Sequence, residues 1–119
     1  MKLPGPDHPI VIAANPKRIR VSAGGVVIAD TTHALSLKEA SYPTVQYVPR
    51  QDANMSLLAR TDRVTHCPYK GDASYFSIHA DGNTLENVIW TYETPFPAMA
   101  EITGHLAFYP DKVMIEEVS

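Results

Sequence analysis

Proline is the feature of this sequence that most restricts its fold, because ten prolines are spread along 119 residues. A proline inside a helix removes a backbone hydrogen bond and clashes with the preceding turn. The β-branched residues Val, Ile and Thr outnumber Leu by 27 to 7, and residues of this type favour strands. The sequence therefore predicts a mainly β protein and excludes a helical bundle or a coiled coil.

Short segments between the turn residues alternate apolar and polar side chains with the period of two that is typical of strands. Gly24-Gly25 predicts one hairpin turn, and Asp81-Gly82-Asn83 predicts another. The segment Pro110-Asp111-Lys112 is expected to join the last two strands in the same way. We expect eight or nine short strands, drawn from residues 18–22, 26–29, 34–39, 44–48, 61–66, 73–80, 87–92, 106–109 and 113–117.

Two short helices are also expected. One covers residues 53–58 with Asp52 as its N-cap, and the other begins at Pro97 and ends at residue 102. Tight turns join antiparallel strands, because parallel strands need long crossovers. The predicted fold is mainly β (α+β by a strict count), a compact antiparallel β-barrel or folded sheet. Residues 1–15 are expected to form an N-terminal arm and residues 16–119 a single β-rich domain.

Charge and cysteine content restrict the compartment and the partners. The single cysteine, Cys67, excludes an intramolecular disulfide and a structural zinc site with two cysteines. No apolar segment has the length of a signal peptide core or a membrane span, which is typical of a soluble cytoplasmic protein without a membrane partner. The net charge of −3, with no basic run beyond residues 17–20, disfavours nucleic acid as a partner. The histidine spacings match no common metal site, so we expect neither a metal nor another cofactor.

The densest group of chemically reactive residues lies between Thr65 and Ala73. A cysteine reacts as the thiolate, which nearby cations favour, and both His66 and Lys70 lie close to Cys67 in sequence. One interpretation is a nucleophilic or ligand-contacting Cys67 with Lys70 as an anion contact. The alternative is a small buried side chain within a structural turn, as is common for free cysteines.

Three other groups are candidates. Arg50 offers two parallel donors to a carboxylate or phosphate, while Asp52 is either an N-cap or a partner of that arginine. Trp90 and Tyr92 lie on one face of an expected strand, where they wall a pocket or fill the core. Glu39, at the end of its strand, is either a buried carboxylate or a surface charge.

Five segments of the chain carry a resemblance to a known family. They are residues 24–30 (Gly-Gly-Val-Val-Ile-Ala-Asp), 47–52 (Tyr-Val-Pro-Arg-Gln-Asp), 67–75 (Cys-Pro-Tyr-Lys-Gly-Asp-Ala-Ser-Tyr), 90–92 (Trp-Thr-Tyr) and 107–109 (Ala-Phe-Tyr). Through them the chain resembles, over residues 16–117, the small bacterial and fungal proteins grouped as domain of unknown function 427. The resemblance implies a compact antiparallel β fold and no established reaction.

The same family has also carried a nucleotidyltransferase label, to which this sequence gives little support. It contains neither a paired-carboxylate metal motif nor a glycine-rich phosphate loop, which such chemistry normally uses. The signature residues that the resemblance assigns here are mainly polar or reactive, which favours a functional role over packing alone. They are Glu39, Tyr47, Arg50, Asp52, Cys67, Tyr69, Lys70, Trp90 and Tyr92.

Three functions remain open from the sequence. The first is binding of a small polar or anionic metabolite in a pocket lined by Cys67, Lys70, Arg50 and Trp90, with the other signature residues as further ligand contacts. The second is a thiol-dependent enzyme, with Cys67 as nucleophile, Lys70 or His66 stabilising its thiolate, and Glu39 or Asp52 transferring protons. The third is a structural or interaction module, for which a homodimer through an edge strand is one form.

Overall fold

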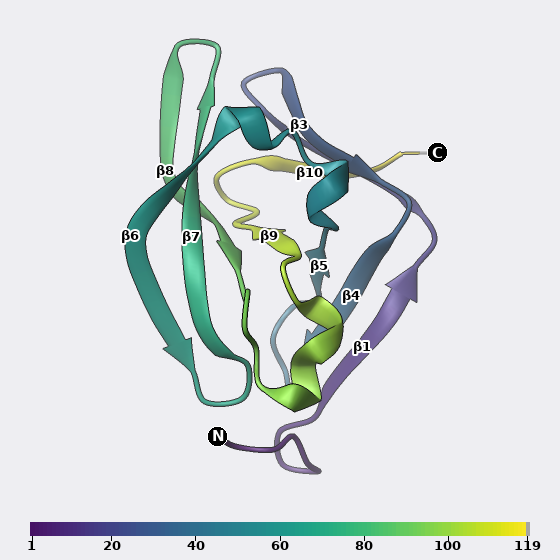
Figure 1. Cartoon of the computed structure of the whole chain (residues 1–119). Helices are drawn as coiled ribbons and strands as arrows, with labels where there is room; N and C mark the ends of the chain where they lie inside the picture. The colour runs from purple at the N-terminus through teal and green to yellow at the C-terminus, as the bar shows by residue number, and fades with distance from the viewer. Residues whose placement is uncertain (119) are drawn as a thin grey trace.

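The computed structural model describes residues 1–118, which form ten strands and three short 3₁₀ helices (Figure 1). The strands are β1 (Ile10–Asn15), β2 (Arg18–Ala23), β3 (Val26–Thr31), β4 (Ala34–Glu39), β5 (Val45–Tyr47), β6 (Leu58–Cys67), β7 (Gly71–Ala80), β8 (Asn83–Thr91), β9 (Leu106–Phe108) and β10 (Met114–Val118). The helices are η1 (Arg50–Asp52), η2 (Met55–Leu57) and η3 (Pro97–Ile102). The prediction of a mainly β chain with little helix is confirmed.

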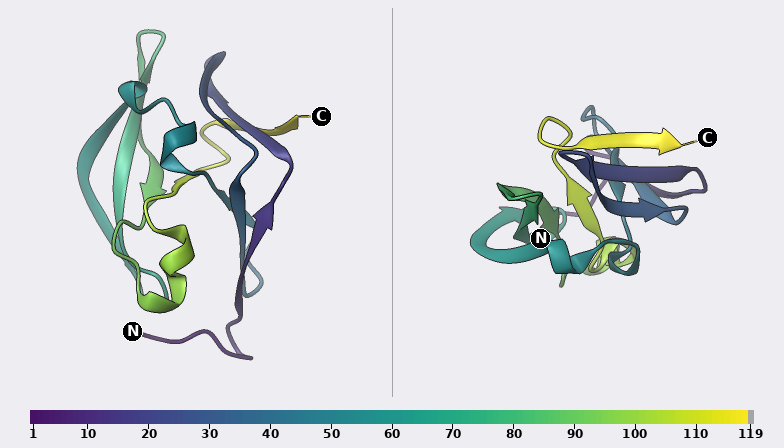
Figure 2. Two further views of the ribbon diagram at one scale, coloured as in Figure 1. Left: turned by 45° about the vertical axis from the view of Figure 1, so that its right-hand side comes forward. Right: turned by 90° about the horizontal axis from the view of Figure 1, so that it is seen from above.

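The strands pair in three antiparallel sheets, with the orders β1-β4-β5, β10-β2-β3 and β6-β7-β8-β9. In Figure 1 the long β6–β7 hairpin lies on one side of the molecule and β1–β4 on the other, with β9 and η3 between them. The views in Figure 2 show β10 beside β2 at the edge of its sheet. Isolated bridges join Val48 to Leu106 and Ala29 to Ala53. The pairing among residues 1–118 does not close into a ring, so the barrel form of the prediction is not supported.

Two predicted hairpins are confirmed, and the last one is wrong. The turns at Gly24-Gly25 and Asp81-Gly82 join β2 to β3 and β7 to β8. In contrast, β9 pairs with β8, and β10 pairs with β2. The reason lies in burial, because every residue of β9 is buried whereas β10 is exposed along most of its length. Both strands lie at the end of a sheet, the buried one beside β8 and the exposed one beside β2.

The expected arm contains a strand that the sequence pattern did not reveal. Residues Ile10–Asn15 form β1, which pairs with β4 in the register Ile10 to Glu39 and Ile12 to Leu37. The arm is therefore fixed to the domain next to Glu39. This position brings the residues before β1 to the site described below.

The helix expected over residues 53–58 is interrupted. Asn54 N donates a hydrogen bond of 2.8 Å to Ile28 O of β3, and this contact divides the segment into η1 and η2. Asp52 lies inside η1 and its side chain caps no helix. The helix expected from Pro97 is present as η3. Within residues 1–118, the helices are too short and too polar to span a lipid bilayer.

The core consists of two clusters of buried side chains. One is aliphatic and contains Val21, Ile28, Val48, Phe76 and Ile89 among its members. The other is rich in tyrosine and combines residues from β4, β5, β7, β9 and η3: Leu37, Tyr47, Ala73, Tyr75, Tyr92, Met99, Ile102 and Ala107. Four members of this second cluster, Leu37, Tyr47, Tyr75 and Tyr92, also line the cavity described below.

Candidate functional site

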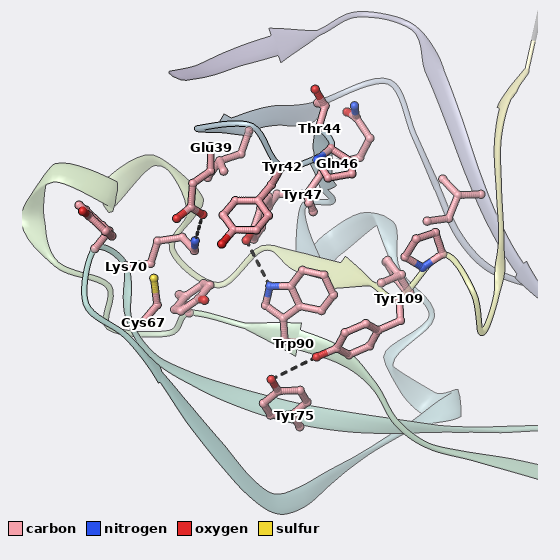
Figure 3. A pocket seen from close by; sticks show the side chains of 18 of the residues that line it. Glu39, Tyr42, Thr44, Gln46, Tyr47, Cys67, Lys70, Tyr75, Trp90 and Tyr109 are labelled. Carbon is pink, nitrogen blue, oxygen red and sulfur yellow. Dashed lines mark hydrogen bonds and ion pairs between the residues drawn. The ribbon is translucent and has the colours of Figure 1, made fainter. Parts of the chain in front are cut away.

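A cavity of about 910 Å³ lies between β4–β5 and the β6–β8 part of the four-stranded sheet (Figure 3). Aromatic side chains form most of its wall. They are Tyr42, Tyr47, Tyr69, Tyr75, Trp90, Tyr92, Phe108 and Tyr109. The charged and reactive side chains His8, Glu39, Cys67 and Lys70 also line the cavity, and Figure 3 shows the last three gathered at one end. We call this the polar end of the cavity.

Lys70 occupies the polar end because its backbone is held on both sides. Phe96 N donates a hydrogen bond of 3.0 Å to Lys70 O, and Gly71 follows with a φ of 110° that favours glycine. Only 10% of the Lys70 side chain is exposed. Its ammonium donates to Glu39 Oε1 and lies 5.9 Å from the centre of the Tyr92 ring.

Glu39 binds two partners through its two oxygens. Oε1 accepts a hydrogen bond from Lys70 Nζ, and Oε2 lies 2.7 Å from His8 Nε2. The His8 ring in turn stacks on Tyr69, with centroids 4.0 Å apart and 7° between the planes. Burial alone would raise the pKa of Glu39, but the hydrogen bonds from Lys70 and His8 outweigh it and lower this pKa. Glu39 is therefore a carboxylate at neutral pH.

The aromatic wall is itself a hydrogen-bonded network. Trp90 Nε1 donates to Tyr47 Oη at 3.2 Å, and the two rings meet edge to face. Trp90 also packs against Tyr109, with centroids 4.7 Å apart. The hydroxyls of Tyr75 and Tyr109 lie 3.3 Å apart, and Thr65 Oγ1 lies 2.9 Å from the Tyr75 hydroxyl. These contacts fix the ring planes and thereby preserve the shape of the cavity.

The tyrosines differ in acidity because their surroundings differ. Burial raises the pKa of both Tyr47 and Tyr92 well above the ordinary value. Burial also raises the pKa of Tyr109 to about 12. For Tyr75, the hydrogen bonds from Thr65 and Tyr109 and the nearby Arg63 guanidinium outweigh burial and lower the pKa. Tyr75 is thus the most acidic hydroxyl of this set.

Seven of the nine residues predicted from the sequence line this one cavity. They are Glu39, Tyr47, Cys67, Tyr69, Lys70, Trp90 and Tyr92. They come from β4, β5, the end of β6, the β6–β7 loop, and β8 with the residue after it. The alternative interpretation of Glu39 as a surface charge is wrong, because its side chain is 15% exposed and paired.

Arg50 and Asp52 do not line this cavity, which corrects the predicted set. Arg50 points into a smaller hollow of about 410 Å³, where Nε donates to Gly104 O and Nη1 lies 3.2 Å from a Glu93 oxygen. Asp52 accepts a hydrogen bond of 2.7 Å from Thr31 Oγ1. Both residues follow Pro49, and η1 turns their side chains away from Tyr47.

The lining residues that were not among the candidates from the sequence include His8, Tyr42, Tyr75 and Tyr109. The last two end the family-like segments 67–75 and 107–109, so their signal was present in the resemblance. His8 belongs to the arm, which has no strand or helix periodicity. Its role depends on the pairing of β1 with β4, a contact that local sequence does not encode.

Groups of three or more His, Cys, Asp or Glu side chains that could hold a metal ion are absent from residues 1–118. Comparison with family models matches residues 11–119 to the family described as "Domain of unknown function (DUF427)". No curated protein matches the chain.

Proposed function

The chain belongs to the domain of unknown function 427 family, as the resemblance of its sequence predicted, and on that premise we propose that it binds a small molecule in the aromatic cavity. The ligand carries a flat ring and an oxygen-bearing polar or anionic group. The ring stacks among Trp90 and its tyrosine neighbours, and the oxygen accepts hydrogen bonds from Lys70. The position of Lys70 carries this proposal.

An ammonium group has three N–H donors. One donates to Glu39, and Lys70 Nζ makes no other hydrogen bond within residues 1–118. Burial of a charged group is unfavourable unless its hydrogen bonds are made. A lysine that is 90% covered yet faces a cavity with free donors is therefore suited to bind an oxygen acceptor. Arg50 has no part in this proposal, because it lies outside this cavity and its guanidinium binds Gly104 and Glu93.

The proposal is tested with the dye 1-anilinonaphthalene-8-sulfonate, which combines flat rings with an anionic oxygen group. Trp90 is the single tryptophan of the chain and lies in the cavity wall, so energy transfer from it to the dye reports occupancy. We expect saturable binding that Lys70→Met weakens by about tenfold, because a hydrogen bond to a charged group contributes roughly 1.5–3 kcal/mol. The double variant Glu39→Gln/Lys70→Met should bind the dye as weakly as Lys70→Met does. It controls for the carboxylate of Glu39, which the single variant leaves without its lysine partner.

The matched control is Lys17→Met, because Lys17 is exposed and pairs only with Glu117. It should leave the dye affinity unchanged. Near-ultraviolet circular dichroism establishes that each variant retains its packing, since loosely packed states also bind this dye. Dye binding that does not saturate, or that is equal in Lys70→Met and the natural chain, would refute the proposed site.

A thiol-dependent reaction is the second candidate, favoured by the position of Cys67. Figure 3 shows its sulfur on the same side of the cavity as the Lys70 ammonium. If Cys67 is a nucleophile, iodoacetamide should modify it at neutral pH about tenfold faster than it modifies glutathione, and Lys70→Met should remove the difference. A rate of Cys67 modification that rises only near pH ~8.5, as for an ordinary thiol, would reject this candidate.

A further inference from the structure

The Glu39 carboxylate at the polar end of the cavity is shared by two partners. Glu39 contacts Lys70 through one oxygen and His8 through the other. The positive charge that balances Glu39 can therefore sit on Lys70 or, when the second ring nitrogen Nδ1 has taken a proton from water, on His8. The His8 side chain is 25% exposed against 10% for Lys70, so His8 is the member that exchanges protons with water.

This arrangement removes the main obstacle to a reactive buried lysine. A lysine is nucleophilic only as the neutral amine, and loss of its proton would leave an unpaired buried carboxylate beside it. A proton taken from water at His8 Nδ1 as Lys70 loses its own would leave Glu39 with a cationic partner throughout. The other groups that face Lys70 are the ring of Tyr92, at 5.9 Å, and the thiol of Cys67 on the same wall.

From this geometry we propose that Lys70 forms an imine with a small aldehyde or ketone held in the cavity. The inference rests on the proposed binding of a small molecule there, and it names the class of that molecule. The aromatic wall suits a carbonyl group attached to a flat ring.

The reaction balances without a further reactant. The Lys70 ammonium gives one proton to water while His8 Nδ1 takes one from water, and the Lys70 nitrogen then forms a bond to the carbonyl carbon as the C=O π bond opens. The carbonyl oxygen takes one proton from the attacking nitrogen and the second from His8 Nε2 through Glu39. It leaves as water when C=N forms. The product is a protonated imine, so the positive charge beside Glu39 is restored.

The test uses the full natural chain, benzaldehyde as the carbonyl probe and sodium cyanoborohydride to reduce any imine to a stable secondary amine. Peptide mass mapping then locates the added benzyl groups. Exposed lysines normally react first, and Lys17, with a side chain 68% exposed, is the internal reference. We expect Lys70 to be modified about tenfold faster than Lys17, because the cavity holds the aldehyde next to the amine. Modification of Lys17 with Lys70 left intact would overturn the proposal.

A variant of the proton-accepting side chain tests the route. His8→Phe keeps an aromatic ring to stack on Tyr69 but removes the nitrogen that faces Glu39. We expect labelling of Lys70 to slow by about tenfold or more and its pH profile to shift upward. Equal rates and equal pH profiles in both proteins would refute the role of His8.

The outcomes for binding and for imine formation are separable. If the dye binds, and benzaldehyde displaces it without labelling Lys70, the imine is refuted and the proposed binding stands. If neither compound binds, the proposed function itself fails. The Lys70→Met protein, in which no benzyl group can be added at this position, confirms the mapping.

Discussion

Four of the tyrosines that line the cavity, Tyr47, Tyr75, Tyr92 and Tyr109, have hydroxyls in different surroundings, which predict an ordered alkaline titration. Tyr75 has a lowered pKa, whereas the pKa values of Tyr47 and Tyr92 are raised by burial. A hydroxyl whose pKa is raised on folding stabilises the protein below the unfolded value of about 10, and this contribution is lost as the pH rises. We expect the free energy of unfolding to fall above pH ~10. In an absorbance titration, Tyr47 and Tyr92 should ionise only as the protein unfolds.

Tyr92→Phe is the variant that checks this linkage. It removes a hydroxyl for which no hydrogen bond is found within residues 1–118, so packing at neutral pH should change little. The slope of stability against pH above ~10 should become smaller. An unchanged alkaline slope in urea unfolding would contradict the assignment of Tyr92.

Arg50 is predicted to stabilise the fold rather than bind the ligand. Its guanidinium joins Gly104 O, Glu93 and the fully buried Thr91, and it lies 5.5 Å from the Phe76 ring centre. We expect Arg50→Met to cost about 1–2 kcal/mol in urea unfolding, since the side chain is one-third exposed and solvent screens part of the interaction. The dye affinity should stay within about twofold. A large loss of dye affinity at unchanged stability would contradict this placement.

The matched control for Arg50 is another arginine–carboxylate pair. Arg18 donates two hydrogen bonds to Asp30 at 2.9 and 2.7 Å, but this pair is more exposed. Exposed ion pairs contribute little to stability. Arg18→Met should therefore change the midpoint of unfolding much less than Arg50→Met does.

Among the strands and turns, the sequence predicted the features that neighbouring residues in the chain determine. Glycine turns such as Gly24-Gly25 require positive φ, so both hairpins built on them could be found. The partners of β1, β9 and β10 lie far away in the chain, and no local pattern specifies them. For the same reason seven site residues could be named, while the direction of Arg50 and the contribution of His8 could not.

Gly71 connects β6 to β7 and sets the position of Lys70. Its φ of 110° is strained for any residue with a Cβ, although the nearest atom to an added Cβ, Phe96 N, would be 3.5 Å away. We expect Gly71→Ala to destabilise the protein by about 1–3 kcal/mol and to weaken dye binding, because the strain is relieved by movement of the turn.

Gly5→Ala is the matched control, since Gly5 lacks a positive φ and an added Cβ would meet no atom within 4 Å. Its stability should stay within about 0.5 kcal/mol of the natural chain. Thermal unfolding of both variants measures the difference. Equal stability of the two would show that the turn tolerates a side chain.

For the whole molecule, three carboxylates predict stability that is lost in acid. The pKa of Asp30 is lowered by hydrogen bonding to Arg18, and that of Glu93 by hydrogen bonding to Arg60. The pKa of Glu39 is lowered because its two hydrogen bonds outweigh burial. A carboxylate with a lowered pKa stabilises the folded state above its unfolded pKa, near 4, and this contribution is lost as the pH falls through the folded pKa.

We therefore expect these carboxylates to leave the free energy of unfolding independent of pH between pH ~5 and pH ~10 and to make it fall below pH ~4. Glu39→Gln should make the acid slope shallower, because one of the three groups no longer titrates. Urea unfolding at a series of pH values measures both slopes. A slope unchanged by Glu39→Gln would contradict the link between this carboxylate and stability.

The pairing of β2 with β10 has a consequence for synthesis on the ribosome. Translation proceeds from the N-terminus, so β2 and β3 emerge well before Met114–Val118. Until then one edge of β2 is without its partner, and an open strand edge can pair with another chain. Nascent chains crowded on one messenger RNA would be the most exposed to this error. A protein that ends before β10 should form inclusion bodies more readily than the full chain.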